Sequence, residues 1–304
     1  MRLSQIGEDG IIEKIVEIVG NGSIGDDCAS VNIDGRYLLL TTDVLVEDIH
    51  FVREILPSAI GWKAITANVS DIVAGGGRPK WALVSLILPD IDMAYLEEIY
   101  RGMRSACEFY GCRVVGGNIS RGRAIAVDIF MVGEAGRAVG RRGALPGDTV
   151  YVSGTLGDSR AGFEIFMSKR RDLEDFEKAL VERHIRPTAR LDYVKHIEKH
   201  ARASMDISDG LIVDASRLAK RSGIRIDIDS GSLPVSAELM TFCKRYGKDP
   251  MEYALAGGED YQLLFCHPRE RENPFLDMTP IGTVMEGEGL FIDGKALEGG
   301  YRHF

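Results

Sequence analysis

The stretch "SAIGWKAITANVSDIVAGGGRPKWALVSLIL" (residues 58–88) joins a helical pattern to a strand pattern across three consecutive glycines. Apolar residues recur at helical spacing up to residue 73, and Ser58 stands where it could cap the first turn. Residues 80–88 form an apolar run of the length and composition that is typical of a strand. A helix followed at once by a strand predicts a domain in which the two kinds of element pack together.

The same alternation extends in both directions. Further strand patterns lie at residues 36–46, 113–117 and 124–135, and helical patterns at 8–19 and 93–110. A second series begins after a segment rich in glycine, proline and arginine, "AGRAVGRRGALPGD" (135–148). Its helical patterns lie at residues 158–168, 173–185 and 190–201. Its strand patterns lie at residues 149–154, 203–207, 224–229 and 261–266. At 304 residues the chain exceeds the size at which a single core usually stops growing. We therefore predict an α/β (α+β) fold with two domains, residues 1–137 and 138–304.

Composition excludes several classes of protein. The net charge of -9 argues against a nucleic-acid partner, which would require a basic surface. No apolar run approaches the ~20 residues of a membrane helix, so we expect no membrane association. The first ten residues lack the apolar core of a signal peptide, which predicts a cytoplasmic protein. The five cysteines have scattered spacings and are predicted to be reduced, without disulfide or metal-binding roles.

Common catalytic motifs are also missing from the sequence. There is no G-x-x-x-x-G-K-[ST] loop, no protein-kinase motif set and no G-x-S-x-G elbow. "GNGSIG" (20–25) matches G-x-G-x-x-G but follows a helical pattern, so it lacks the strand–turn–helix context of a dinucleotide site. His196 and His200 are four residues apart among lysines, which is more typical of a solvated helix face than of a zinc site.

The conspicuous feature is a series of aspartates beside glycines or at the ends of apolar strands. Each one alone is explained by a turn or a helix cap, and Asp209 before Gly210 is a natural helix start. Together they are a set of hard oxygen ligands that suits Mg²⁺, and the glycines of "GGNISRG" (116–122) let the backbone approach a phosphate. The hydroxyls of Thr41, Thr42 and Ser208 could add weaker ligands. The pattern predicts Mg²⁺-dependent phosphate chemistry at a set comprising Asp26, Asp27, Asp43, Asp71, Asn118, Asp206 and Asp209.

In order along the chain, these motifs resemble those of the thiamine-monophosphate kinase family. This family belongs to a superfamily with aminoimidazole ribonucleotide synthetase, selenophosphate synthetase and a hydrogenase-maturation protein. The resemblance runs from the first helix to the last residue and rests on the strings "IGDDCAS", "TTDVLVEDIHF", "GWKAITANVSDIVAGGGRPKWALVSLILP", "VVGGNIS", "GRRGALPGDTVYVSGTLGDS", "RPTARL", "MDISDGL", "LAGGEDYQLLF" and "GYRHF".

The resemblance implies an ATP-dependent phosphorylation of thiamine monophosphate to thiamine diphosphate. It also implies an N-terminal α/β domain that forms a homodimer by joining sheets into a β-barrel, and a C-terminal α/β domain with a mixed sheet and flanking helices. ATP and several Mg²⁺ ions would bind in the cleft between the domains.

Site residues follow from the same motifs. The resemblance assigns Mg²⁺ to Asp27, Asp43, Asp71, Asn118 and Asp206, with Thr42 and Asp209 in support and with Asp26 and Thr41 behind them. It assigns ATP to Tyr100, Gly116, Gly117, Arg142 and Ser208, and the thiamine substrate to His50, Glu259 and Tyr301. Simpler readings stay open: a surface or interdomain salt bridge for Arg142, a turn for Glu259, packing for His50 and anchoring of the C-terminal tail for Tyr301. Asn118 replaces an aspartate that many relatives carry, which removes a charge from that position.

The expected chemistry agrees with a sequence that is rich in ligands and poor in candidate bases. A phosphate monoester has a second pKa of ~6, so the acceptor already presents an ionised oxygen near pH 7 and needs no general base. We therefore predict direct in-line transfer, with Asp43 and Asp71 acting through Mg²⁺. Two alternatives stay open: another ATP-dependent synthetase of the superfamily, of the purine-biosynthesis type, and a non-catalytic ATP-binding regulator.

Overall fold

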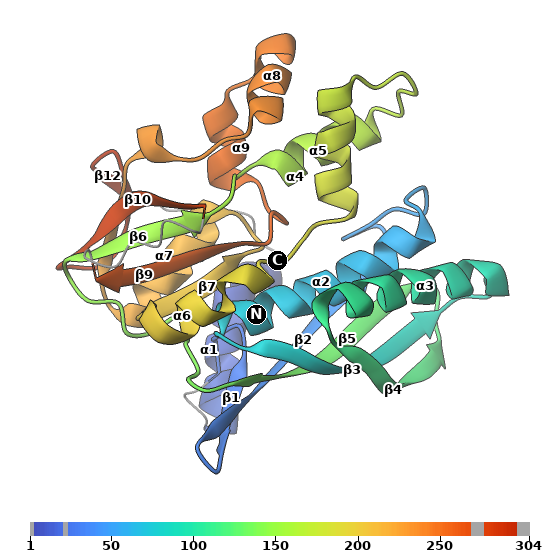
Figure 1. The fold of residues 1–304 in the computed structure, drawn as a ribbon, viewed down its shortest axis with the longest axis horizontal. Coiled ribbons are helices and arrows are strands. Elements are labelled where there is room, and N and C mark those ends of the chain that lie inside the picture. Colours follow the sequence, from blue (N-terminus) through green and yellow to red (C-terminus); the bar gives the residue numbers. More distant parts are fainter. Residues whose placement is uncertain (1–2, 21–23, 269–276, 297–304) are drawn as a thin grey trace.

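A computed structural model describes residues 3–20, 24–268 and 277–296. In this part of the chain the strands form two mixed sheets, one with five strands and one with seven (Figure 1). The prediction of a two-part α/β architecture is therefore confirmed at the level of two mixed sheets with flanking helices.

The five-stranded sheet is built from the first half of the chain. Its strands pair antiparallel except for β3 and β4, which run parallel. In spatial order they are β1 (Ala29–Ile33), β2 (Arg36–Val46), β5 (Ala126–Ala135), β3 (Arg78–Leu88) and β4 (Arg113–Arg121). Helices α2 (Pro57–Ala74) and α3 (Met93–Tyr110) pack together, and α2 lies against the sheet.

Helix α2 is buried along nearly its whole length. Ser58 does not cap it: the helix begins at Pro57, whose fixed φ suits the first helical position and whose missing N–H costs nothing there. The backbones of α2 and α3 cross closely, because a Cβ on Gly61 would lie 1.9 Å from the carbonyl oxygen of Ile99, and one on Gly102 would lie 1.8 Å from that of Ser58. This crossing fixes the position of α2 over the sheet.

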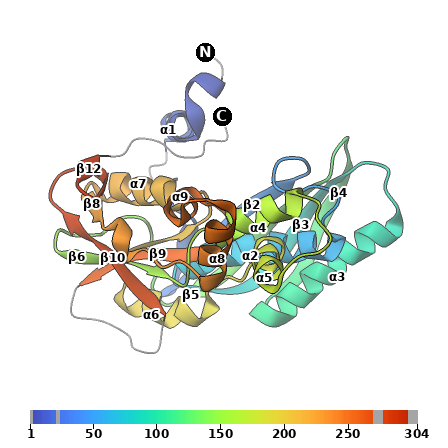
Figure 2. The ribbon, with the colours of Figure 1, turned by 90° about the horizontal axis from the view of Figure 1, so that it is seen from above.

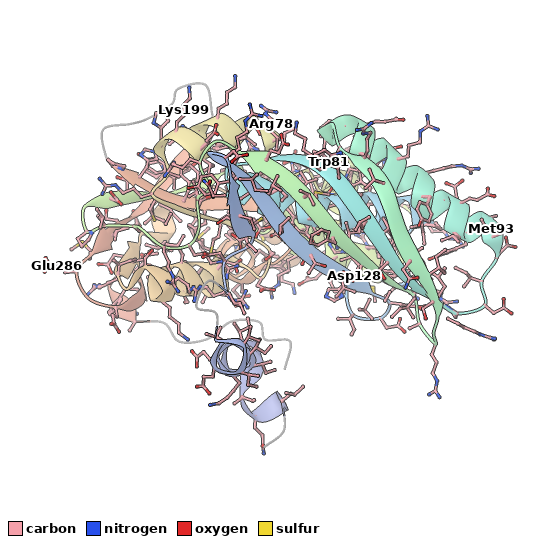
Figure 3. The ribbon with its side chains drawn as sticks, turned by 90° about the horizontal axis from the view of Figure 1, so that it is seen from below. Arg78, Trp81, Met93, Asp128, Lys199 and Glu286 are labelled. Carbon is pink, nitrogen blue, oxygen red and sulfur yellow. The ribbon has the colours of Figure 1, made fainter. Side chains whose placement is uncertain are left out.

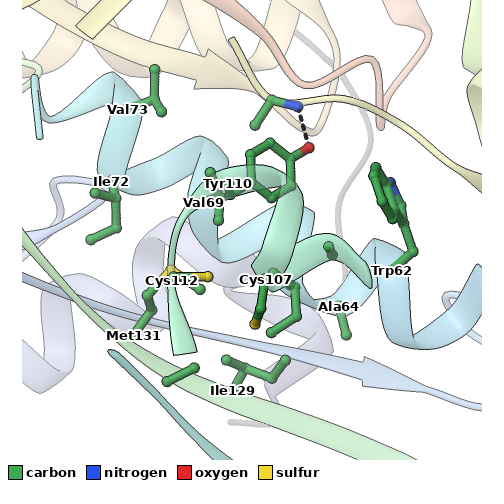
Figure 4. Close-up of a cluster of buried hydrophobic side chains, with 14 of the residues drawn as sticks. Trp62, Ala64, Val69, Ile72, Val73, Cys107, Tyr110, Cys112, Ile129 and Met131 are labelled. Atoms are coloured by element: carbon green, nitrogen blue, oxygen red, sulfur yellow. Dashed lines mark hydrogen bonds between the residues drawn. The ribbon is translucent and has the colours of Figure 1, made fainter. Parts of the chain in front are cut away.

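The core beneath α2 also joins the two halves of the chain. Trp62, Tyr110 and Met131 pack in one cluster with Tyr193 and Phe265 from the second half. The hydroxyl of Tyr110 accepts a hydrogen bond of 2.9 Å from the N–H of Ala189 (Figure 4). One buried cluster is therefore shared by the two halves, beside two further clusters made of described residues from the second half alone.

The seven-stranded sheet comes from the second half of the chain. Only β8 and β11 pair in parallel. Its spatial order is β12 (Lys295–Ala296), β11 (Gly289–Ile292), β8 (Arg225–Ile228), β10 (Met278–Met285), β6 (Asp148–Ser153), β9 (Gln262–Pro268) and β7 (Ala203–Ile207). The helices of this half are α4 (Asp158–Met167), α5 (Asp175–Ile185), α6 (Val194–His200), α7 (Leu211–Ser222), α8 (Ala237–Tyr246) and α9 (Pro250–Ala256).

One face of the five-stranded sheet carries no helix (Figure 3). Large apolar side chains are exposed on its strands, among them Trp81, Leu83, Ile87, Ile119 and Phe130. Within the described residues the sheet is open and forms no closed barrel. Helix α1 (Gly7–Val19) projects from the body formed by the two sheets (Figure 2), and its Glu13 forms an ion pair of 2.7 Å with Lys220 of α7. No described helix has both the length and the apolar composition needed to cross a membrane.

Candidate active site

A cavity of about 770 Å³ is lined by residues from both halves of the chain. Strand β2 and helix α2 line it from the first half, and α4, the end of β7, α7 and the loop before β9 line it from the second. Three regions can be distinguished: a carboxylate cluster, a cationic region from α7, and a region with apolar side chains beside Glu259.

The carboxylate cluster consists of Asp27, Asp71 and Asp206. One carboxylate oxygen from each lies within 4.8 Å of the others. Asp27 lies just before β1, Asp71 one turn before the end of α2, and Asp206 near the end of β7, so three separate segments supply these carboxylates. Asp43 on β2 lines the same cavity. The convergence of these four aspartates, expected from the sequence, is therefore seen in the structure.

Burial and mutual repulsion dominate the electrostatics of this cluster. Burial raises the pKa of Asp71 well above its usual value, and the neighbouring Asp43, Asp206 and Asp27 raise that pKa further. Burial and the charge of Asp27 likewise raise the pKa of Asp206. The hydroxyl of Thr41 donates a 2.5 Å hydrogen bond to the carboxylate of Asp71. Closely spaced, buried carboxylates of this kind are stabilised as anions by a bound cation.

The donor set fits Mg²⁺. All of its members are hard oxygen atoms, which Mg²⁺ prefers, and they lie beside space for substrate oxygens. Cys28 adds no thiolate, because burial and the surrounding aspartates raise the pKa of its thiol well above the usual value. The fit to a hard divalent cation therefore rests on carboxylates alone.

The neighbouring aspartates Asp26 and Asp27 have different partners. Asp27 forms an ion pair with the guanidinium of Arg141, and the Arg141 backbone N–H donates a 3.0 Å hydrogen bond to Asp26. Arg141, rather than the predicted Arg142, lines the cavity; Arg142 is exposed and is not among the lining residues. The doublet "RRG" offers no signal that distinguishes the two arginines, so the sequence analysis missed Arg141.

Ser208 and Asp209 lie in the turn that precedes α7, and both line the cavity. Their backbone N–H groups each donate a 3.1 Å hydrogen bond to the carboxylate of Asp214, whose pKa burial raises to about 8. The carboxylate of Asp209 pairs with Arg217. The N-cap position of α7 is occupied by Gly210, not by Asp209. With Lys220 and Arg221, Arg217 forms the cationic region of the cavity, which we expect to attract a polyanion.

The third region contains the predicted substrate residues His50 and Glu259. Apolar side chains line it around them, including Ile49, Phe51, Val52, Phe163 and Met167. The ring Nδ1 of His50 accepts a 3.0 Å hydrogen bond from the N–H of Val46, which fixes the ring orientation. Glu259 has a left-handed backbone, with φ of 62°. The carboxylate of Glu259 lies 2.5 Å from the ammonium group of Lys63, a residue that the sequence analysis missed.

Several predicted residues either have another partner in the structure or lie outside the lining of this cavity. Thr42 lines it, but its hydroxyl donates to Asp128, 2.8 Å away. At Gly117 a Cβ would lie 1.9 Å from the carbonyl oxygen of Val84, so the close approach of β3 requires a glycine there. Tyr301 lies outside the described residues. Those that are described but do not line the cavity are Thr41, Arg142, Tyr100, which packs half-buried against the core, and Gly116, Gly117 and Asn118 on the exposed strand β4.

Comparison with known proteins identifies the family. The model of the AIR synthase related protein N-terminal domain matches residues 25–135, and that of the C-terminal domain matches residues 146–292. A thiamine-monophosphate kinase of Aquifex aeolicus is 59% identical, and the match covers 100% of both chains. The chain belongs to the thiamine-monophosphate kinase family. Another member, from Escherichia coli K12, is 35% identical, with 92% of this chain and 91% of that protein covered.

Solved structures agree with this family assignment. The structure of AaThiL complexed with AMPPCP and TMP has a TM-score of 0.99 and 59% identity, and covers 100% of this chain and 99% of that chain. A HypE hydrogenase maturation protein in complex with ATP, at 20% identity and a TM-score of 0.69 over 93% of this chain and 92% of that one, shares the fold. The predicted family is therefore confirmed, and with it the prediction that the chain is a kinase enzyme acting on thiamine phosphate.

Proposed function

We propose that the chain transfers the γ-phosphoryl group of ATP to thiamine monophosphate, giving thiamine diphosphate and ADP. The observation that carries this proposal is the cluster of Asp27, Asp71 and Asp206 in one cavity with Glu259 and a cationic region. A site of this kind offers ligands for cations that neutralise phosphate charge, and a separate region for an organic group. The relative whose structure contains AMPPCP and TMP supports the same pair of substrates.

Residue roles in this proposal follow the predicted assignments. Asp27, Asp43, Asp71 and Asp206 would hold several Mg²⁺ ions, with Asp209, Thr42 and Asn118 as further ligands and Asp26 and Thr41 in support. Ser208 would contact ATP phosphates at the N-terminal end of α7, and Arg142, Tyr100, Gly116 and Gly117 stay predicted ATP contacts. His50 and Glu259 would contact the thiamine moiety, as would Tyr301. When bound, the ions supply positive charge between the two phosphate groups.

Charge neutralisation and alignment are the central requirements of this reaction. Two unit charges ~4 Å apart repel by ~4 kcal/mol at an effective dielectric constant of 20, and the two substrates present several such pairs. We propose in-line transfer without a phosphoenzyme, because the acceptor phosphate is already ionised and the buried aspartates would be engaged in holding cations. Phosphate trapped on the protein by rapid quenching during turnover would contradict this route.

One assay tests the activity. The purified protein is incubated with Mg²⁺, ATP and thiamine monophosphate, and thiamine diphosphate is measured. Formation of the diphosphate supports the proposal. Its absence together with turnover of an aminoimidazole precursor would favour the purine-type synthetase, and ATP binding without any turnover would favour a regulator.

The proposal includes a homodimer formed through the uncovered face of the five-stranded sheet. Exposed apolar side chains such as Trp81 and Phe130 support it, because such a face is stabilised when a second copy covers it. Joined sheets of two copies would make the predicted barrel. Trp81→Glu should convert a dimer to a monomer in sedimentation experiments, and a monomeric parent protein would overturn this part. The domain division at residues 137 and 138 and the cytoplasmic location stay predictions.

A further inference from the structure

Lys63 is a buried cation in helix α2, a helix that is buried along nearly its whole length. Only 3% of its side chain is exposed, and it lies in the second turn of α2. A lysine this deep is stable when it is paired, because an unpaired buried ammonium group is strongly disfavoured. Glu259 is the ion-pair partner that the described residues provide, at 2.5 Å from Nζ to Oε1.

Glu259 is held in an unusual backbone conformation. Its φ of 62° is disfavoured for a residue with a side chain, so other contacts must hold it in place. Its N–H donates a 2.7 Å hydrogen bond to the carbonyl oxygen of Ser208, and two residues later Tyr261 donates to Ile207. These bonds fix the backbone, and the contact with Lys63 fixes the side chain.

The second carboxylate oxygen of Glu259 stays available to the cavity. Among the described residues, Nδ1 of His184 lies 3.6 Å from Oε2, which is too far for a hydrogen bond. Burial and the charge of Lys63 lower the pKa of His184 to about 4, so this ring is neutral near pH 7. Glu259 and His184 line the cavity, whereas Lys63 does not. Lys63 therefore lies behind the carboxylate and reaches a ligand only through it.

We infer that Lys63 is a positioning residue that aims Oε2 of Glu259 at a hydrogen-bond donor on the ring system of the substrate. This inference rests on the proposed function and deepens it. An aminopyrimidine ring bears an amino donor on a flat apolar body. The free oxygen of Glu259 lies in the same cavity region as Phe163 and Met167, which suits both parts of such a ring. ATP and Mg²⁺ would bind elsewhere in the cavity, so Lys63 should affect one substrate selectively.

The test compares Lys63→Met, which removes the donor, with Lys63→Gln, which keeps a neutral donor. We expect Lys63→Met to raise the KM for thiamine monophosphate at least 10-fold while the KM for ATP changes less than 2-fold, and Lys63→Gln to recover part of the loss. Calorimetric titration with thiamine monophosphate should show the same weakening of binding without turnover. Arg202→Met is the matched control, because Arg202 pairs with the buried Asp148 outside the cavity.

Two outcomes would overturn the inference while leaving the proposed function intact. One is an active wild-type enzyme with a folded Lys63→Met variant whose KM for thiamine monophosphate is unchanged. The other is an equal loss for both substrates. Should Lys63→Met fail to fold, the variant Lys63→Met/Glu259→Gln removes both charges. It should bind thiamine monophosphate no more weakly than Glu259→Gln alone, and weaker binding by the double variant would contradict the coupling. A wild-type enzyme that makes no thiamine diphosphate would instead refute the proposed function.

Discussion

The N–H of Glu259 donates a 2.7 Å hydrogen bond to the carbonyl oxygen of Ser208. Ser208 comes directly after β7 and two residues after Asp206, so the loop with the predicted substrate carboxylate is held to the strand end with the predicted metal carboxylate. The distance between these two parts of the cavity is thereby set by backbone contacts. Alignment of an acceptor with a phosphoryl donor depends on this kind of fixed spacing.

Asp71→Asn should lower kcat by roughly 100-fold or more, because one anionic ligand of the cluster is lost. The fold should persist, since an amide is isosteric and relieves the repulsion that raises the pKa of Asp71. Steady-state kinetics at saturating Mg²⁺ and thermal melting check both statements, and Asp43→Asn should behave alike. Asp172→Asn, at an exposed position outside the cavity, is the control. Near-normal rates for Asp71→Asn would remove it from the site.

Asn118→Asp should be tolerated and should lower the Mg²⁺ concentration needed for half-maximal rate. The position is exposed on β4, so an added charge has no burial cost, and a carboxylate binds Mg²⁺ more strongly than an amide. Titration of activity with Mg²⁺ is the measurement. Loss of activity would mean that the amide has another task.

Asp214→Ala should raise the KM for ATP by roughly 10-fold, whereas Asp214→Asn should change it little. The carboxylate accepts the N–H groups of Ser208 and Asp209, so alanine leaves two partly buried donors without this acceptor and loosens the turn. An asparagine keeps an acceptor oxygen. The KM for ATP of the two variants, measured side by side, checks this difference, and equal values would show that the turn needs no such support.

Stability should fall as the pH drops from 6.5 to 4. Burial lowers the pKa of His196 from an ordinary 6.5 to about 4, and neither ring nitrogen has a hydrogen-bond partner among the described residues. Between these values the unfolded chain binds more protons than the folded one, so the free energy of unfolding decreases, by about 1.4 kcal/mol per pKa unit. The lowered pKa of His184 decreases the free energy of unfolding over the same pH range. His196→Phe should flatten the decline in urea titrations at several pH values, and an unchanged slope would exclude His196.

Gly102→Ala should destabilise the fold by about 1–3 kcal/mol, because its Cβ would lie 1.8 Å from the carbonyl oxygen of Ser58 and force α2 and α3 apart. Chemical denaturation measures the loss. Arg104→Ala, on an exposed part of the same helix, should change stability little. A melting point for Gly102→Ala equal to that of the parent would show that the crossing can relax.

The sequence predicted the alternation of elements and the convergence of the aspartates, since strand ends and glycine-rich turns leave local signals. It did not distinguish Arg141 from Arg142, because only three-dimensional packing decides which of two adjacent arginines enters a cavity. The sequence does contain a signal for Lys63, because a single lysine within a buried helical pattern needs an anionic partner. The start of α2 was misplaced because Pro57 competes with Ser58 as an initiating residue. Gly116, Gly117 and Asn118 lie on β4 outside the cavity lining, so their predicted contacts with ATP and Mg²⁺ stay predictions.

The cluster draws Asp27 and Asp71 from the first half of the chain and Asp206 from the second. A divalent ion held by all three would act as a clamp across the molecule, and any opening of one half away from the other would release it. Binding of the ion and the closed arrangement of the two halves would then be thermodynamically coupled. The melting temperature should rise with free Mg²⁺ even without nucleotide, and this increase should be lost when either half lacks its aspartate.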